Sequence, residues 1–385
     1  MSVRLAAWVS DGVHVVDVDG AWARDQPRPE EKSMAISHRL VGAISVVLAV
    51  AMVTGGCTKK DSNGPSTSGG AGSSQASGAS EGKVKVAFVP KLQGSPYFEA
   101  MDTGAKQAAG DLGDVEWLYQ GPTSADAAAQ AQIVRSFIQQ KVDALVIAPN
   151  DPDSMAPLMK QAQDAGIKVL TADTDAPNSV RQAFVNQATA EGIGNTTAET
   201  LMKAMGGKGK WAIVSCGETA ENLNSWIAAE KAYVSAKYPE AELVDVVYSG
   251  EDQAKGTQMA TDLMSAHPDL KGLLGQCTTS AVGVAQAVKD ANKIGQVFTV
   301  GIGTPKSMKP YLADGSSSGS ILWNVQNLGY LTAWAGEQLA KGKTFEATNK
   351  VNDQMPAVKW DEASKTLVLG DPLLITTENV DQFNY

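Results

Sequence analysis

The amino-acid sequence predicts an α/β fold with two doubly wound parallel-sheet lobes. From Lys83 onward, short runs of β-branched residues alternate with longer Ala-rich segments whose apolar residues recur at the helical period. Strand-helix-strand units of this kind are right-handed and build parallel sheets that helices cover on both faces. The alternation begins a second time at Lys210, and the chain is too long for one ordinary hydrophobic core. Both observations indicate two domains of one design.

The first domain is predicted from short aliphatic runs that are separated by segments of helical period. The predicted strands are Val84–Val89, Val115–Tyr119, Ala144–Ala148, Lys168–Ala172 and Ala183–Val185. The predicted helices are Tyr97–Leu112, Ala125–Gln140 and a segment that runs through Met155 and Leu158 to Ala165.

The second domain repeats this pattern, and the last part of the chain breaks it. The predicted strands are Lys210–Ser215, Leu243–Tyr248, Gly272–Gly275 and Val297–Ile302. The predicted helices between them are Ser225–Lys237, Ala254–Ala266 and Ser280–Ala291. The final third is predicted to hold a strand, a helix and a late hairpin, at Ser320–Val325, Leu328–Leu339, and Val358–Trp360 with Leu367–Leu369.

Charge and residue usage exclude several kinds of function. The formal net charge of -10 argues against a nucleic-acid partner, which would need a basic face. After residue 57 the only histidine is His267, in a predicted surface loop, so neither a hydrolase triad nor a zinc site is expected. The sequence shows no phosphate loop, dinucleotide glycine pattern or nucleophile-base pair. We therefore predict no enzyme activity, no cofactor and no metal.

The segment before Cys57 has the features of an export signal. His38 and Arg39 precede a mostly apolar stretch, residues 40–53, that is short for a membrane span. Small residues stand directly before Cys57, as in the lipobox of bacterial lipoproteins, whose cysteine is acylated; Thr54 replaces its usual aliphatic residue. The prediction is a lipid-anchored protein outside the cytoplasm. A plain signal peptide cut nearby and a single spanning anchor are the alternatives.

The chain around this signal divides into three predicted segments. Residues 34–56 are the signal peptide, and residues 57–82 are the lipidated cysteine with a flexible Ser/Gly linker, because such a composition cannot bury enough apolar surface to fold. Residues 1–33 contain six acidic residues, which are out of place ahead of a signal's basic region. We expect translation to begin at Met34; a cytoplasmic extension is the alternative.

Polar and aromatic side chains stand directly after the predicted strands. Open parallel sheets bind ligands beyond the carboxyl ends of their strands. Carboxylates and amides pair with adjacent hydroxyls, and an aromatic face covers the C–H side of a sugar ring, so a polyhydroxylated ligand is predicted. Taken singly, the two aromatic residues also fit a core, and the acids and asparagines also fit helix caps. The candidate ligand-binding residues are Lys91, Tyr97, Phe98, Asp173, Asp175, Asn222, Asn224, Gln276, Thr278 and Asn324.

Several short motifs are shared with one family, and they are specific as a set. They are Phe88-Val89-Pro90-Lys91-Leu92 with Phe98, Gly121-Pro122-Thr123, Val169-Leu170-Thr171 with Asp173 and Asp175, Val185-Asn186-Gln187, Asn224 with Trp226, Thr304-Pro305 with Pro310-Tyr311, and Leu322-Trp323. By these motifs the chain from Lys83 to its end resembles the type I periplasmic sugar-binding proteins of ABC importers, ribose-binding type. Within that type it is most similar to the autoinducer-2 and rhamnose-binding branch.

The resemblance implies two lobes that clamp a ligand and are joined by a hinge of three segments. These segments are expected near 186–188, 323–326 and 349–352. Contacts that a ligand makes with both lobes only in the closed state would drive closure. The expected first lobe is 83–187 plus 325–350, the second is 188–324 plus 351–375, and 376–385 is a C-terminal tail.

The resemblance also assigns roles to single residues. Lys91 matches the family's ligand-binding lysine, and Asp173 matches its sugar-binding aspartate. Gln276 and Thr278 match contacts on the second lobe. The positions that differ in charge or type from the autoinducer-2 binder are Asn222, Leu223 and Asn324. These differences favour a neutral sugar, such as a deoxyhexose, a pentose or a related polyol.

Cys216 and Cys277 each follow a predicted strand of the second lobe. In the usual order for this fold those strands are neighbours, with backbones about 4.8 Å apart, which is close to the span of a disulfide. An exported protein meets oxidising conditions. A Cys216–Cys277 disulfide and two small buried thiols are both compatible with the sequence.

The functional prediction is a monomeric solute-binding lipoprotein, outside the cytoplasm or periplasmic, that captures a sugar and delivers it to an ABC permease. A receptor of the same fold that signals to a membrane sensor without transport is the first alternative. An enzyme on a doubly wound scaffold is the second.

Overall fold

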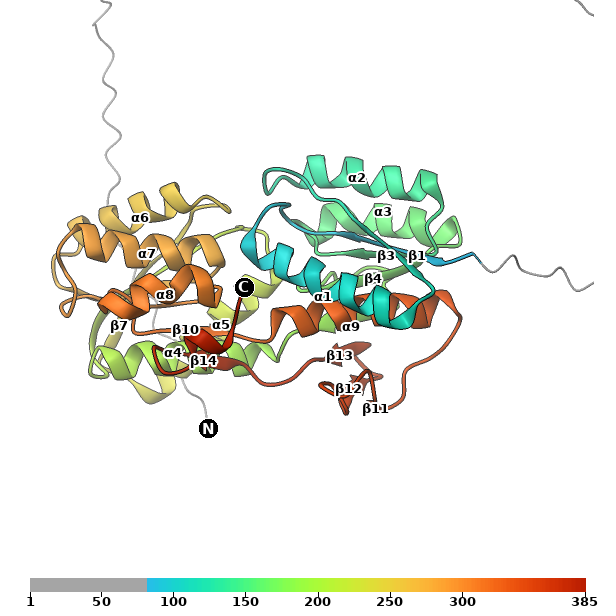
Figure 1. The fold of residues 1–385 in the computed structure, drawn as a ribbon. Coiled ribbons are helices and arrows are strands. Elements are labelled where there is room, and N and C mark those ends of the chain that lie inside the picture. Colours follow the sequence, from blue (N-terminus) through green and yellow to red (C-terminus); the bar gives the residue numbers. More distant parts are fainter. Residues whose placement is uncertain (1–81) are drawn as a thin grey trace, which may run out of the picture. The chain divides into compact units, whose positions relative to one another are not determined.

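The computed structural model describes residues 82–385. The predicted signal, the lipidation site Cys57 and the extension 1–33 lie outside these residues. The described part contains two α/β lobes, each built on one sheet (Figure 1). In residues 82–385, none of the helices has both the length and the apolar character that a membrane crossing needs.

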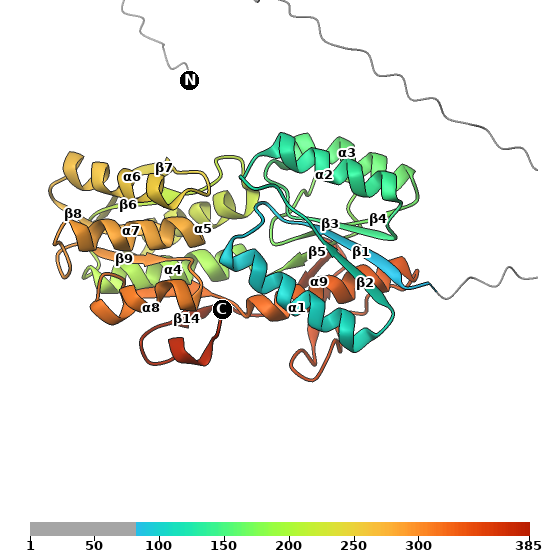
Figure 2. The same cartoon turned by 45° about the horizontal axis from the view of Figure 1, so that its top comes forward.

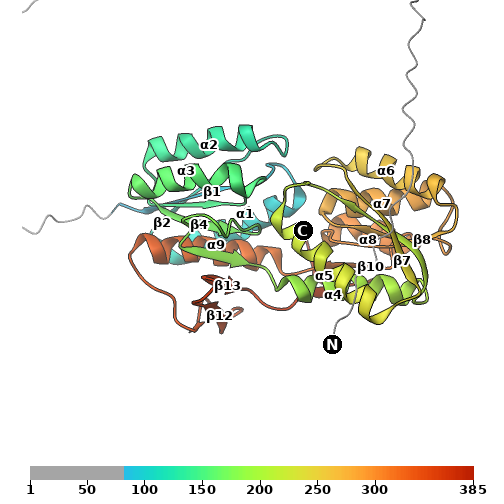
Figure 3. The same cartoon turned by 180° about the vertical axis from the view of Figure 1, so that it is seen from behind.

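The first lobe is a sheet with two helices on each face. α1 (Pro96–Leu112) and α9 (Val325–Ala340) cover one face, and α2 (Ala127–Gln140) and α3 (Pro152–Asp164) cover the other (Figures 1 and 3). Side chains alternate between the faces along each strand, so Phe88 packs toward α1 and α9 while Val89 packs toward α2 and α3. The parallel strands are, in spatial order, β2 (Val115–Tyr119), β1 (Val84–Val89), β3 (Ala144–Ile147), β4 (Lys168–Ala172) and β5 (Ala183–Asn186).

The second lobe repeats this design. α4 (Ala190–Ala204) and α5 (Glu221–Lys237) cover one face of its sheet, α6 (Gln253–Ala266) and α7 (Thr278–Asp290) cover the other, and α8 (Pro305–Asp314) packs beside α7 (Figure 2). An edge strand, β14 (Leu373–Ile375), runs antiparallel to β10 (Gly319–Leu322). The other parallel strands follow from β10 in the order β9 (Phe298–Gly301), β8 (Leu270–Gly275), β6 (Gly209–Ser215) and β7 (Ala241–Tyr248).

Two helices were not predicted, α4 and α8. α4 contains Gly192 and Gly194, which are poor helix formers, but Gly194 is required by packing: a Cβ there would lie 2.7 Å from the Trp226 carbonyl oxygen of α5. α8 is short and carries Pro310 inside it. β10 ends at Leu322, three residues earlier than predicted, because Trp323 and Asn324 lead into α9.

The late hairpin extends the first sheet, which corrects the predicted lobe boundary. β13 (Thr366–Val368) pairs parallel with β5, and β12 (Val358–Asp361) and β11 (Thr348–Asn349) continue outward from it. Residues 358–368 therefore belong to the first lobe, whereas the sequence predicts 351–375 in the second. The third crossing lies at 369–372 and not near 349–352. The other two crossings lie at 187–189 and 323–324, and a short 3₁₀ helix, Val380–Gln382, follows β14.

α1 and α9 pack backbone against backbone through two glycines. A Cβ at Gly329 would lie 1.8 Å from the Met101 carbonyl oxygen, and a Cβ at Gly104 would lie 1.8 Å from the Gln326 carbonyl oxygen. Only glycine fits this close approach. The packing fixes the start of α1, with Tyr97, against the Trp323 crossing that precedes α9.

Candidate functional site

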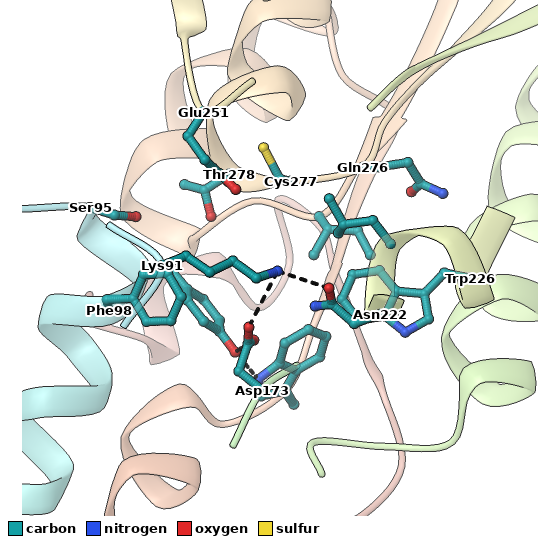
Figure 4. A pocket seen from close by; sticks show the side chains of 14 residues that line it. Lys91, Ser95, Phe98, Asp173, Asn222, Trp226, Glu251, Gln276, Cys277 and Thr278 are labelled. Atoms are coloured by element: carbon teal, nitrogen blue, oxygen red, sulfur yellow. Dashed lines mark hydrogen bonds and ion pairs between the residues drawn. The ribbon is translucent and has the colours of Figure 1, made fainter. Parts of the chain in front are cut away.

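A small cavity of about 40 Å³ lies between the lobes, beyond the carboxyl ends of both sets of strands, and Figure 4 shows the side chains around it. The first lobe contributes Lys91, Ser95, Tyr97, Phe98 and Asp173; the second contributes Asn222, Leu223, Trp226, Glu251, Gln276, Cys277, Thr278 and Ile302; the crossing contributes Trp323.

Lys91 connects the two lobes across this cavity. Its Nζ donates a hydrogen bond of 2.8 Å to Asn222 Oδ1 on α5 and lies 3.8 Å from Asp173 Oδ2 (Figure 4). The lysine is 4% exposed, and a buried ammonium group needs such partners because it has lost its water. The side-chain amide of Asn150 donates to the Lys91 carbonyl oxygen and holds the backbone there.

Asp173 is held in an unusual backbone conformation directly after β4. The Thr174 amide donates to the Ala172 carbonyl oxygen at 2.7 Å, and Asp173 between them has a φ of 66°. A γ-turn with positive φ is rare and strained, and strain of this kind gathers at functional sites. Tyr97 Oη donates to Asp173 Oδ1 at 2.8 Å, and Thr174 Oγ1 donates to Oδ2 at 3.0 Å.

The Tyr97 hydroxyl is fixed as a hydrogen-bond donor. Burial raises the pKa of Tyr97 well above its ordinary value, and the negative charge of Asp173 raises it further. Trp323 Nε1 donates to the same hydroxyl at 3.1 Å. The Trp323 ring lies edge-on to those of Tyr97 and Trp226, with centroids 5.8 Å apart in each pair. These contacts hold one aromatic wall in a single orientation.

Polar and apolar side chains both line the cavity. Lys91, Asp173 and Asn222 form its polar group, joined by the contacts above. The apolar residues are Phe98, Leu223, Trp226, Ile302 and Trp323. Charged groups that make directed hydrogen bonds, together with apolar and aromatic surface, suit a ring that carries both hydroxyls and C–H groups.

Glu251 also lines the cavity, and the sequence reasoning missed it. It stands in the loop after β7 and is half-buried. Burial raises its pKa, and the nearby positive charge of Lys91 opposes this effect. The rule that ligands contact residues beyond strand ends would have identified it, since Glu251 is the third residue after Tyr248.

Of the ten predicted contacts, seven line the cavity, but Gln276 turns its polar end away. Its Nε2 donates to Glu230 Oε2 on α5 at 2.6 Å, and Figure 4 shows its amide directed away from Lys91 Nζ. Thr278 begins α7. The predicted residues that line the cavity are Lys91, Tyr97, Phe98, Asp173, Asn222, Gln276 and Thr278.

Three predicted residues lie outside the cavity lining. Asp175 accepts a hydrogen bond of 2.6 Å from Arg181 Nη2. Asn224 donates from Nδ2 to the Glu218 carbonyl oxygen at 2.9 Å. Asn324 caps α9 by accepting from the Asn327 amide at 2.9 Å. These polar groups are engaged in structural contacts, so we leave all three residues out of the proposed contact set.

Cys216 and Cys277 form a disulfide beside the cavity, with Cα atoms 6.1 Å apart. The strands before them, β6 and β8, are neighbours in the sheet. The ligating atoms of these cysteines and Glu251 all lie within 4.8 Å of one another. A metal would need thiolates, and the disulfide removes them, so the cluster is not a metal site in this state.

A family model described as a periplasmic binding protein domain matches residues 86–344. The chain is also 32% identical over 241 residues to the D-ribose/D-allose-binding protein of Pseudomonas aeruginosa, covering 60% of this chain and 75% of that protein. The chain belongs to the type I periplasmic sugar-binding proteins. This finding confirms the predicted family and the two-lobed fold class.

Two solved structures illustrate the similarity of this fold to known proteins. A solute-binding protein of an ABC transporter from Clostridium phytofermentas, with bound L-rhamnose, is 27% identical and has a TM-score of 0.72, covering 78% of this chain and 98% of its own. LsrB from Clostridium saccharobutylicum, in complex with AI-2, is 25% identical with a TM-score of 0.73, covering 78% of this chain and 100% of its own. Periplasmic sugar-binding proteins act outside the cytoplasm with ABC transporters and are not enzymes.

Proposed function

We propose that this protein captures a small neutral sugar in the interlobe cavity and delivers it, as a monomer, to an ABC import permease. The observation that carries the proposal is the Lys91 contact, which joins Asp173 of the first lobe to Asn222 of the second. A ligand that hydrogen-bonds these side chains has partners in both lobes only when the lobes are closed. Binding is thereby coupled to closure, and a permease can recognise the closed form.

The apolar part of the lining supports a ligand with an apolar group. A 6-deoxyhexose has a methyl group, and a pentose lacks the exocyclic hydroxymethyl group, so either can contact Trp226, Ile302 and Trp323 without placing an unpaired hydroxyl against them. The relative from C. phytofermentas holds L-rhamnose, a deoxyhexose, on the same fold. We propose Lys91, Tyr97, Phe98, Asp173 and Asn222 as the contacts that hold the sugar.

A thermal-shift screen tests the ligand class. The purified chain without its predicted signal segment should show a melting temperature several degrees higher with a deoxyhexose or pentose, because a ligand at 100 times its Kd stabilises the native state by about 2.7 kcal/mol. No shift with any monosaccharide, polyol or AI-2 would contradict the sugar assignment. A shift with AI-2 alone would favour the signalling receptor, and unchanged uptake of the bound sugar after deletion of the gene would rule out the transport role.

We propose that Cys57 carries the lipid anchor, with residues 34–56 as the signal peptide and 57–82 as a flexible tether; the sequence around Cys57 supports this. Acyl chains contribute about 0.8 kcal/mol per buried methylene, so a multiply acylated cysteine holds a protein at the membrane. Cys57→Ser is expected to move the protein from the membrane fraction to the soluble fraction of the cell envelope, while Thr58→Ala leaves it with the membrane. Recovery of the Cys57→Ser protein with the membrane would contradict the anchor.

A further inference from the structure

Glu230 is a carboxyl group buried beside the cavity but outside its lining. It lies on α5 and is fully buried. No ion pair within residues 82–385 includes it. Its side chain accepts a hydrogen bond of 2.6 Å at Oε2 from Gln276 Nε2. A buried carboxylate with no cation beside it is unfavourable, and such groups become neutral instead.

This hydrogen bond leaves one oxygen of the carboxyl group and the oxygen of the amide without a donor. Glu230 Oε1 and Gln276 Oε1 are both buried, and neither has a hydrogen-bond partner in the part of the chain that the structure describes. They are the second oxygens of the two planar groups that the 2.6 Å bond joins. Both are acceptors when the carboxyl group is ionised, but a protonated carboxyl group supplies one donor. A proton on Glu230 Oε1 would turn one of these two acceptors into a donor.

We propose that Glu230 is a protonated positioning residue for the proposed sugar site. Its Oε1–H donates to Gln276 Oε1 while its Oε2 accepts from Gln276 Nε2, which gives an acid-amide pair with two parallel hydrogen bonds. The pair fixes Gln276, the first of three consecutive residues that line the cavity. The pairing itself needs no ligand; its effect on binding rests on the function proposed above.

The surroundings of Glu230 agree with a neutral carboxyl group. Burial raises its pKa to about 8, while the Gln276 hydrogen bond and the charge of Lys231 on the same helix oppose that rise. Glu230 is 0% exposed, so bulk water does not reach its carboxyl group. The charged residues on α4 and β7, which pack against α5, are Glu191, Glu199, Lys203, Glu242 and Asp245; none of them affects the pKa of Glu230.

The pair couples the proton to the cavity wall through the loop between β8 and α7. The Gln276 backbone N–H donates to the Val214 carbonyl oxygen. Cys277 and Thr278, the next two residues, also line the cavity. When Glu230 ionises, the donor to Gln276 Oε1 is lost and the loop must shift or admit water. Since only the protonated form keeps the wall in place, affinity for the sugar is expected to be about tenfold lower at pH 9 than at pH 6.

Glu230→Gln distinguishes an effect of this proton from an effect of side-chain packing, because a glutamine amide presents both a donor and an acceptor at every pH. The variant is expected to bind the sugar at pH 6 like the parent protein and to lose the alkaline weakening. The matched control is Glu240→Gln, the same change at an exposed position. This control should still bind the sugar more weakly at alkaline pH. An equal loss of affinity in both variants at pH 9 would overturn the positioning role.

The ionisation state itself can be measured in the full-length protein without any ligand. Infrared spectra at pH 7 should contain the C=O band of a protonated carboxylic acid that Glu230→Gln removes and Glu240→Gln does not. The raised pKa also predicts that the stabilisation due to Glu230 is complete below pH 4.5 and is lost as the pH rises through about 8, so the melting temperature of the parent should fall relative to Glu230→Gln over that range. If the band and this fall are present and no sugar binds, the proposed function fails and the pair stands; if both are absent, the pair is wrong.

Discussion

Asp173→Ala is expected to weaken sugar binding by about 100-fold or more, since hydrogen bonds to charged groups contribute about 1.5–3 kcal/mol each. The Asp173 carboxylate is the one fixed negative charge in the polar group of the cavity. Its removal takes acceptors away from the ligand hydroxyls. It also leaves the buried Tyr97 hydroxyl and Lys91 ammonium without their first-lobe partner. Isothermal titration with the sugar found by the thermal-shift screen measures the loss.

The backbone at Asp173 decides which control is informative. Because its φ is 66°, alanine is strained there, whereas asparagine tolerates the left-handed region. Asp173→Asn keeps the turn and one acceptor for Tyr97, and removes only the charge and one acceptor. We expect it to bind more weakly than the parent and more tightly than Asp173→Ala. Asp153→Asn, at an exposed position, should bind normally, and unimpaired binding by Asp173→Ala would show that the site is misplaced.

The polar group of the site could be predicted because it obeys a simple rule. Lys91 and Asp173 follow β1 and β4, and in parallel sheets the ends of such strands meet at one edge. The resemblance to the sugar-binding family then selected these residues among other polar residues. The same rule could not separate Asn222, which bonds Lys91, from Asn224 and Asn324, which serve the backbone, because an asparagine at a helix start suits either role.

The features that the sequence could not reveal depend on long-range pairing. Nothing local indicates that β13 would join β5, although Thr366 pairs with Phe184 from a distant part of the chain, and this pairing places the third crossing at 369–372. The Glu230–Gln276 pair is similar, since each residue reads as an ordinary polar residue until the fold buries both. The sequence does not predict α4 because its glycines lower its helix propensity, and one of them, Gly194, allows the close approach to α5.

Replacing both Cys216 and Cys277 by serine is expected to lower the free energy of unfolding by up to about 4 kcal/mol. The disulfide closes a loop with a sequence separation of 61 residues, and the chain-entropy model gives about that value for such a loop. Chemical denaturation of the parent and the double variant measures the difference. Reductant should destabilise the parent and leave the double variant unchanged, which separates loss of the bond from the effect of the serines.

The bond should also affect binding, because it joins the ends of two neighbouring strands at the cavity wall. Cys277 lies between Gln276 and Thr278, and its link to Cys216 keeps this part of the wall in place when no ligand is bound. A wall that is already ordered costs the ligand less binding energy than one that must be ordered on binding. The double variant should therefore bind the sugar more weakly, mainly through faster dissociation. Two free thiols in the unfolded, unreduced chain from residue 83 onward would show that the bond does not form and would remove the basis for both effects.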